Sequence, residues 1–211
     1  MNNDARVIGQ VSSISLHNVN TQNIRKLGYQ LTKRFLDVII ALFGLLFLIP
    51  VYICVKIAYV LTGDFTSVIY SQNRIGLNGK EFRFYKFRSM VPDADDILKL
   101  LLETNKAARV EYEENKKLKN DPRVTKIGKF LRKTSLDELP QLINILKGDM
   151  ALIGNRPYLP REKQDMGLLY RQVVKTKPGL TGYWQTNGRS DVSFDRRLEL
   201  ESWYSNHYSF K

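Results

Sequence analysis

The feature that constrains this chain most is an uninterrupted apolar run near its N-terminus. Residues 38–55, VIIALFGLLFLIPVYICV, carry no charged side chain over 18 positions. An apolar run of this length suits a membrane helix, whereas the helices of soluble cores rarely need one. A cleaved signal peptide fits poorly, because the run begins far from the N-terminus and no small-residue cleavage site follows it. The run therefore predicts insertion into a membrane.

Two features of the flanking sequence complicate a simple crossing. Lys33 and Arg34 precede the run and Lys56 follows it, so the positive-inside rule gives no clear orientation. Pro50 lacks a backbone N–H and is expected to kink or break the helix, which leaves two arms that are short for a bilayer about 30 Å thick. A re-entrant hairpin and an ordinary kinked transmembrane helix both fit, and the residues alone do not decide between them.

Charge and residue usage narrow the chemistry. The chain has 33 Lys and Arg against 21 Asp and Glu, a net charge of +12. Such an excess attracts nucleic acid, an anionic membrane surface or phosphorylated substrates. The single cysteine, Cys54, excludes an intramolecular disulfide, and the two histidines, His17 and His207, stand near opposite ends of the chain. Carboxylates, Lys and Arg are therefore the groups expected to carry any chemistry.

The organisation expected along the chain is a polar, flexible arm over 1–24, a membrane hairpin over 25–62 and one compact α+β unit over 63–211. In that unit β-branched and aromatic residues at 67–76 and 81–90 flank a turn at 77–80, which predicts a β-hairpin. Helices are expected at 92–118, 124–135, 161–175 and 194–210.

Asp137 and Glu138 are adjacent carboxylates in SLDELPQ, two residues before Pro140. They have a structural explanation, since Ser135 and Glu138 match a capping box and Asp137 is an alternative N-cap. They also have a chemical one. A helix N-terminus keeps an Asp ionised, and neighbouring carboxylates bind Mg²⁺ together with substrate phosphates. Taken alone, the motif favours the structural explanation.

Four cations shift that balance, because they stand in aromatic or turn-forming motifs. Arginines beside Gly and Pro can grip a diphosphate through two hydrogen bonds at once, although each cation alone is equally consistent with a surface charge. These cations are Lys86, Arg88, Arg156 and Arg189.

Several motifs in matching order carry a resemblance to a known family. They read KRFLD, YSQNRIGLNGKEFRFYKFRSM, DPRVTKIGKFLRKTSLDELPQLINILKGDMALIGNRP and KPGLTGYWQTNGRS. Over about Lys33 to Tyr204 the chain resembles the bacterial sugar transferases, the monotopic polyprenyl-phosphate phosphoglycosyl transferases. The resemblance implies a re-entrant helix–break–helix with its break at Pro50, on the cytoplasmic face of the bacterial inner membrane.

The resemblance also implies an activity. Members of the family move a sugar 1-phosphate from a UDP-sugar to a polyprenyl phosphate, such as undecaprenyl phosphate, and release UMP. By analogy Asp137 would be the nucleophile that forms a covalent phosphosugar, and Glu138 its partner, with Mg²⁺ bound by both. The substrate-binding residues would be Lys86, Arg88, Arg156, Arg189 and Glu201.

Two residues depart from the family pattern: Asn155 stands where a first proline is usual, and Glu201 where an Asp is common. The chain would be a minimal form, since it lacks the multi-span N-terminal region of longer relatives and stops at Lys211. Downstream glycosyltransferases are possible partners, no nucleic-acid partner is expected, and the sugar and the oligomeric state are not indicated. The alternatives are a catalytically inactive membrane-anchored partner in a glycan-assembly complex and a membrane-anchored binding protein.

Overall fold

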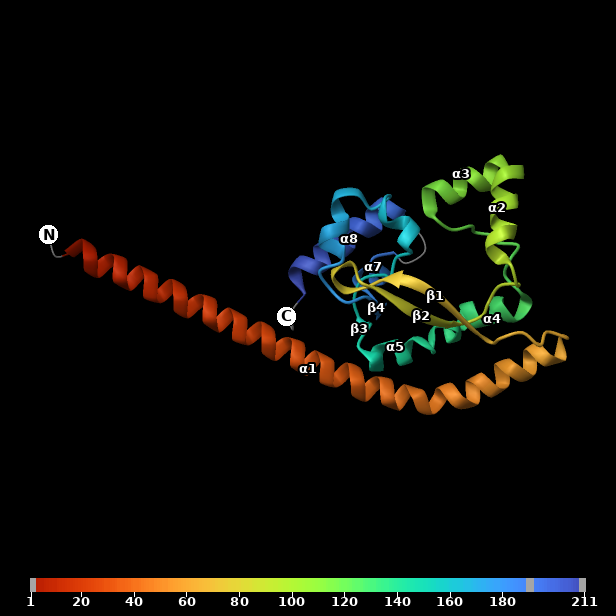
Figure 1. The fold of residues 1–211 in the computed structure, drawn as a ribbon, viewed down its shortest axis with the longest axis horizontal. Helices are drawn as coiled ribbons and strands as arrows, with labels where there is room; N and C mark the ends of the chain where they lie inside the picture. The colour runs from red at the N-terminus through yellow and green to blue at the C-terminus, as the bar shows by residue number, and fades with distance from the viewer. Residues whose placement is uncertain (1–2, 189–191, 209–211) are drawn as a thin grey trace.

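One long helix dominates the N-terminal part of the protein in the computed structural model, which describes residues 3–188 and 192–208. Side chains are described from Leu27 onward. Helix α1 runs from Asn3 to Leu61 with Pro50 inside it. Figure 1 shows α1 as one ribbon that extends far beyond the rest of the molecule and bends in its orange stretch.

The expected arm and helix break therefore need correction. Helix starts at Asn3, within the segment 1–24 that was expected to be irregular, and it continues through Pro50 to within one residue of the expected boundary at 62. Proline removes one hydrogen bond and crowds the preceding turn, which bends a helix when packing holds both sides. Leu48 and Val51, on either side of Pro50, both pack against a buried cluster that α1 shares with the folded domain.

The two faces of α1 differ in character. Its inner face packs on the domain through Ala41, Val55 and Tyr59, which are buried. Gly44 permits a close approach, since a Cβ there would lie 2.6 Å from Leu142 Cδ1. The outer face exposes large apolar side chains along the stretch from Leu27 to Leu61, among them Leu31, Phe35, Ile39, Phe43, Leu46, Phe47, Ile49, Ile53, Ile57 and Leu61.

The predicted β-hairpin is confirmed. Strand β1, Ile69–Ile75, pairs antiparallel with β2, Glu81–Phe87, across the short 3₁₀ helix η1, Leu77–Gly79. Asn78 adopts a left-handed conformation in this turn, with φ of 56°, which Asn tolerates better than most residues.

Helix α5, Gln141–Lys147, lies between α1 and the hairpin. Asn144 fixes α5 to β2, because its fully buried side chain accepts from the Tyr85 N–H at 3.1 Å and donates to the Arg83 carbonyl at 2.7 Å. Apolar residues of α1, β2 and α5 share one core cluster with Met150. This packing sets the position of β2 relative to the turn that precedes α5.

The other expected helices are partly confirmed. The region 92–118 forms two helices, α2 (Ala94–Thr104) and α3 (Lys106–Asn115), because Asn105 ends the first and caps the second by accepting from Ala108 N–H. Helix α4 (Lys126–Thr134) is as expected, and α8 (Phe194–His207) confirms the last expected helix up to His207, while residues 209 and 210 of that expectation lie outside the described residues.

The single helix expected over 161–175 is wrong. This region forms three short pieces, η3 (Pro160–Lys163), η4 (Gly167–Leu169) and α6 (Tyr170–Val173). Gly167 interrupts them with a φ of +52°. An apolar pattern does not register such a break, because one glycine in a left-handed conformation leaves the flanking periodicity unchanged.

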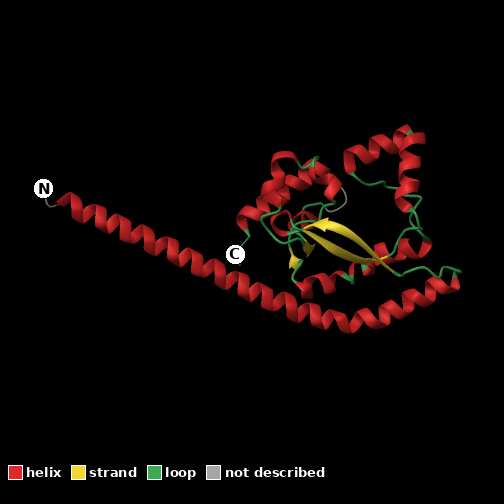
Figure 2. Ribbon diagram, viewed as in Figure 1, coloured by secondary structure: helices red, strands yellow, loops and turns green. Residues whose placement is uncertain are grey.

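A second, small sheet pairs β3 (Ala151–Ile153) in parallel with β4 (Gly179–Thr181), and the short helix α7 (Tyr183–Thr186) follows β4. Gly154 lies so close to the facing segment that a Cβ would fall 2.3 Å from the Lys177 carbonyl oxygen. Figure 2 shows how little of the molecule these strands occupy compared with the helices. The fold is thus mixed, mainly helical, with a small hairpin as expected.

Candidate active site

The two adjacent carboxylates converge on one lysine. Lys86 Nζ lies 3.5 Å from Asp137 Oδ2 and 3.3 Å from Glu138 Oε1. The Asp137 side chain is 7% exposed, whereas those of Lys86 and Glu138 are about one-third exposed. A buried carboxylate therefore lies behind a cation that reaches solvent.

The local chain explains how the carboxylates are presented. Ser135 ends α4 in a left-handed conformation, with φ of 57°, and its side chain makes no capping hydrogen bond. The short 3₁₀ helix η2, Leu136–Glu138, follows, and Pro140 is the N-cap of α5. The expected capping box and the expected N-cap role of Asp137 are therefore both wrong. The two carboxylates lie in a turn between two helices, without a capping role.

Lys86 comes from the hairpin, on the face that also carries aromatic and cationic side chains. Its Nζ lies 5.6 Å from the centre of the Phe84 ring, and the Arg74 guanidinium lies 5.3 Å from the same ring. Strand register pairs Arg74 with Phe82 and Tyr70 with Lys86, which places all of them on one face. Arg74 was not predicted as a site residue from the sequence. The predicted turn fixes the strand register, so the alternation of side chains would have placed Arg74 on the face of Lys86.

A cleft opens beside this cluster. Arg156 and Pro157 border it from the loop after β3, and α7 contributes Trp184, also missed in the sequence. Burial, reinforced by the charge of Arg156, lowers the pKa of Arg74 to about 10, so Arg74 remains a cation at neutral pH. The lining residues are Arg74, Phe84, Lys86, Glu138, Gln141, Arg156, Pro157, Gly179, Leu180, Trp184 and Gln185.

Arg156 is half-buried and borders the cleft. Its Nε makes no hydrogen bond within the described part of the chain. The loop that carries it is fixed by Asn155, whose buried amide nitrogen lies 2.9 Å from the Val173 carbonyl oxygen and 2.7 Å from Ser205 Oγ. Asn155 therefore anchors the loop with side-chain hydrogen bonds at the position where the family pattern has proline.

Glu201 supports the loop that carries Arg156 and does not line the cleft. The side chain is fully buried, and its Oε1 accepts from the Arg156 backbone N–H at 2.7 Å. Burial raises its pKa from 4.5 to about 7, and the Arg156 N–H and the nearby arginines reduce that rise. The substrate-binding role expected for Glu201 is not what this geometry provides.

Arg88 also lies away from the cleft. Its guanidinium is 2.8 Å from Asp64 Oδ2, donates to the Ser67 carbonyl at 2.8 Å and covers the Tyr59 ring. Strand β2 ends at Phe87, so alternation no longer places Arg88 on the face of Lys86. Arg88 joins the end of the hairpin to the end of α1 and does not reach the expected substrate.

Two other candidate positions have different outcomes. Arg189 lies outside the described residues, so its expected substrate-binding role stays a prediction. Pro50 lies within α1, as described above.

The expected Mg²⁺ can be tested against the donor set. The described residues contain no group of three or more His, Cys, Asp or Glu that could hold a metal. Asp137 and Glu138 nevertheless bring two carboxylates to one cation position, which Lys86 occupies. Mg²⁺ commonly uses one or two protein carboxylates and takes its other ligands from water and substrate phosphates. The two residues therefore fit a substrate-assisted Mg²⁺ site and not an all-protein one.

The comparisons with known proteins show the family of the chain. The family model for "Bacterial sugar transferase" matches residues 28–211, and the chain belongs to this family. It is 44% identical over 182 residues, 86% of the chain, to an undecaprenyl-phosphate galactose phosphotransferase of Salmonella typhimurium. It is 36% identical over 192 residues, 85% of the chain, to the UDP-glucose:undecaprenyl-phosphate glucose-1-phosphate transferase of Escherichia coli.

Coverage of the relatives differs. The matched region spans 38% of the Salmonella protein and 37% of the Escherichia coli protein. By contrast, the chain is 40% identical over 189 residues to the exopolysaccharide production protein ExoY of Sinorhizobium fredii, covering 90% of the chain and 83% of that relative. The chain thus spans less than half the length of several relatives that it matches, and the chemistry that their names describe is taken up next as a proposal.

Proposed function

We propose that the protein transfers a sugar 1-phosphate from a UDP-sugar to a polyprenyl phosphate, undecaprenyl phosphate by analogy with its relatives, and releases UMP. The observation that carries this proposal is the convergence of Asp137 and Glu138 on Lys86, beside a cleft with two further arginines. This arrangement supplies a nucleophile next to cations that can bind a diphosphate.

In the first step a carboxylate oxygen of Asp137 attacks the phosphorus that bears the sugar. The new bond joins Asp137 to the sugar phosphate, and the bond to the bridging oxygen breaks so that UMP leaves with that oxygen and its electron pair. Lys86, Arg74 and Arg156 offset the negative charge on the phosphoryl oxygens and on UMP. The ammonium group of Lys86 lies between Asp137 and solvent and is paired with both carboxylates. A substrate phosphate that binds Lys86 therefore competes with these carboxylates for the ammonium group.

In the second step a phosphate oxygen of the lipid attacks the same phosphorus. The Asp137 carboxylate leaves, and the product is a polyprenyl diphosphosugar. Dividing the transfer into two displacements lets a soluble nucleotide and a membrane lipid use one site in turn. Bound Mg²⁺, held by Asp137 and Glu138 with substrate oxygens, would supply further charge neutralisation to the diphosphate. The product is a suitable acceptor for later glycosyltransferases in a pathway such as exopolysaccharide synthesis.

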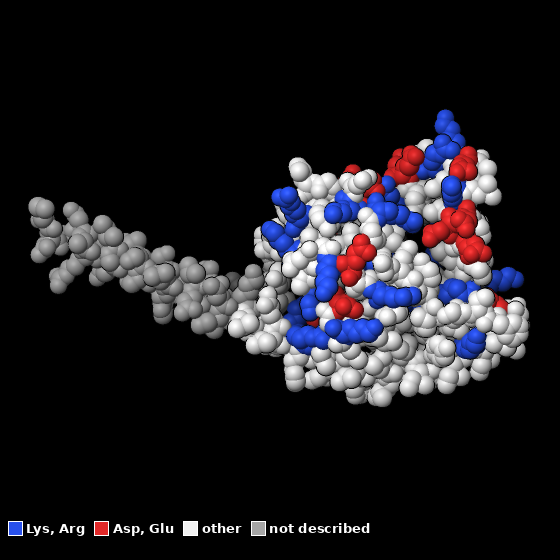
Figure 3. All heavy atoms as spheres, viewed as in Figure 1, with Lys and Arg blue, Asp and Glu red and all other residues white. Residues whose placement is uncertain are grey.

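The contacts of α1 support a monotopic placement. Arg34 near the start of the apolar stretch donates to the Ile145 carbonyl, and Tyr59 near its end donates to the Arg88 carbonyl. A crossing helix could not hold one polar domain along this whole length without drawing that domain into the bilayer. Figure 3 shows a lower edge, along α1, with few charged atoms and clusters of Lys and Arg above it. We propose that α1 enters and leaves the cytoplasmic face of the inner membrane, with the cleft at headgroup level.

The test is UMP release from a panel of UDP-sugars with undecaprenyl phosphate and Mg²⁺. Wild-type protein should release about one UMP per molecule without lipid and should continue to release UMP only when lipid sustains turnover, and Asp137→Asn should abolish both phases. Asp165→Asn is the matched control, because Asp165 is a half-exposed carboxylate that pairs with Lys116 away from the cleft. Release that survives in a folded Asp137→Asn variant contradicts the assignment, and no release from any sugar by wild type favours the inactive-partner alternative.

A further inference from the structure

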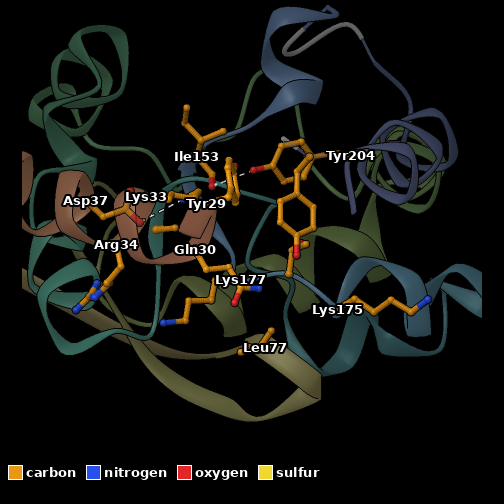
Figure 4. Close-up of a pocket in the computed structure, with 13 residues that line it drawn as sticks. Tyr29, Gln30, Lys33, Arg34, Asp37, Leu77, Ile153, Lys175, Lys177 and Tyr204 are labelled. Atoms are coloured by element: carbon orange, nitrogen blue, oxygen red, sulfur yellow. Dashed lines mark hydrogen bonds and ion pairs between the residues drawn. The ribbon is translucent and has the colours of Figure 1, made fainter. Parts of the chain in front are cut away.

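A second cavity, of about 270 Å³, lies between the middle of α1 and the segment that leads into β4. Residues 29–37 of α1 form one wall, and Lys175, Lys177 and Tyr204 contribute to the other. It shares no lining residue with the cleft beside Lys86. Figure 4 shows Lys33, Arg34 and Lys177 around this space, while Lys175 extends away from them.

The cations of the cavity outnumber its carboxylate. Asp37 is already engaged, since it lies 3.2 Å from Lys33 Nζ and its other oxygen accepts from the Leu152 N–H at 3.0 Å. Arg34 donates to two carbonyls at the end of α5, at 2.6 and 2.9 Å, which orients the guanidinium but does not neutralise it. The arrangement leaves a net positive potential beside α1.

Lys177 is a cation of the cavity that makes no direct contact with a carboxylate among the described residues. It is half-buried, and its ammonium group forms no ion pair or hydrogen bond with the described residues. Burial, reinforced by the charge of Arg34, lowers its pKa. Both Lys177 Nζ and Arg34 Nη2 lie within 4 Å of the point where Gly148 would carry a Cβ. Two cations held this close favour an anion between or beside them.

The surroundings identify the kind of anion. The cavity lies at the beginning of the apolar stretch Leu27–Leu61, and Leu31 and Phe35 on the same part of α1 are largely exposed. Tyr29 and Tyr208, whose ring centres are 5.7 Å apart, belong to the lining, and tyrosine is enriched at headgroup level. A phosphate bound in the cavity could thus continue into acyl chains along the outer face of α1. A cavity of this volume also accommodates a phosphate with water, since one water occupies about 30 Å³ in the liquid.

We propose that this cavity binds the phosphate group of an anionic membrane phospholipid, held by Lys177 and Arg34, and so fixes the depth of α1 at the membrane surface. The site is separate from the proposed transfer chemistry, and its ligand remains bound while the substrates exchange at the cleft.

The experiment measures thermal stabilisation of the 211-residue chain in detergent by short-chain phosphatidylglycerol, with phosphatidylcholine and inorganic phosphate as parallel arms. Phosphatidylglycerol should stabilise wild type most. Lys177→Gln should weaken its apparent affinity by about fivefold, the effect expected of one basic residue at an anionic lipid surface. Lys177→Arg should restore binding. Lys99→Gln, which removes an exposed lysine on α2, should behave as wild type.

Three results would overturn the proposal. Equal stabilisation by inorganic phosphate would make this a free-anion site, and equal loss in Lys99→Gln would make the effect one of net charge. A selective rise in the KM for undecaprenyl phosphate in Lys177→Gln would assign the cavity to the acceptor lipid. If Lys177→Gln does not fold, a phosphatidylglycerol with a photoreactive headgroup should label residues 29–37 or 175–177 of wild type, and labelling elsewhere contradicts the site. Lipid binding is measured without turnover, so its failure is distinguishable from failure of the transferase proposal.

Discussion

Two acidic sites in this protein use the same residue types for different purposes. Asp137 and Glu138 meet Lys86 at the edge of a cleft, with two of the three side chains partly exposed. Glu201 meets the Arg156 backbone in a fully buried position. In the proposed function the first site exchanges its internal ion pairs for substrate phosphate, whereas the buried side chain of the second does not reach a cleft. Access, more than charge, separates a chemical site from a structural one.

Replacement of Lys86 is the most severe test of the difference between the accessible site at Asp137 and the buried site at Glu201. Lys86→Met should lower kcat/KM for UMP release by about 10²- to 10³-fold, the usual cost of removing one preorganised charge-stabilising donor. Lys80→Met is the matched control, because Lys80 is an exposed lysine beside the same hairpin turn. Steady-state kinetics with UDP-sugar and lipid check the prediction. A Lys86→Met enzyme within a few-fold of wild type would remove Lys86 from the transfer chemistry.

A change at the buried Glu201 should alter the thermal stability of the protein and not the transfer chemistry. The folded-state pKa of Glu201 is about 7, above its unfolded value of 4.5, so the folded protein holds the proton more tightly. The stabilisation is complete below pH 4.5 and is lost as pH rises through 7, by up to about 3 kcal/mol. Glu201→Gln, which stays neutral, should flatten the fall of Tm between pH 5 and 8 relative to wild type.

Detergent-solubilised protein and a thermal unfolding series across this pH range provide the measurement. Parallel curves for wild type and Glu201→Gln would show that Glu201 ionises normally. The description of Glu201 as a fully buried carboxyl group with a raised pKa would then be wrong.

Arg88 tests, for a cation, the same distinction between a group at the cleft and a group with a structural role. Arg88→Met should destabilise the fold by about 2 kcal/mol, because Asp64 Oδ2 and the Ser67 carbonyl both lose the guanidinium that binds them. UMP release per folded molecule should be unchanged. Unfolding measurements and active-site-normalised kinetics separate the two effects, and a selective loss of turnover in a stable variant would return Arg88 to the substrate site.

The smallest effect is expected at Arg156. Arg156→Met should raise the KM for UDP-sugar about tenfold with a smaller change in kcat, since one charge-assisted contact to the diphosphate is lost. Glu201 accepts from the Arg156 backbone, so this substitution leaves that hydrogen bond intact. A fall in kcat with unchanged KM would instead place Arg156 in the chemical step alone.

The sequence predicted local elements better than tertiary roles. Alternation and turn chemistry were sufficient for the β-hairpin, and the carboxylate pair was found because its neighbours in the chain are distinctive. The role of Glu201 was not predictable, because its full burial depends on contacts between α8 and a loop 45 residues away. Arg88 illustrates the same limit, since its partners come from the chain after α1. Helix continuity through Pro50 depended on packing against the domain, which no local pattern encodes.

The central claim is that Asp137 becomes covalently linked to the sugar phosphate. The most direct measurement is the intact mass of the protein after rapid mixing with its UDP-sugar and Mg²⁺, without lipid. We expect an increase of one sugar phosphate in wild type and Asp165→Asn, its location at Asp137 by peptide mapping, and its disappearance on addition of undecaprenyl phosphate. Turnover in wild type with no adduct at any time, or an adduct that persists in Asp137→Asn, would contradict the account.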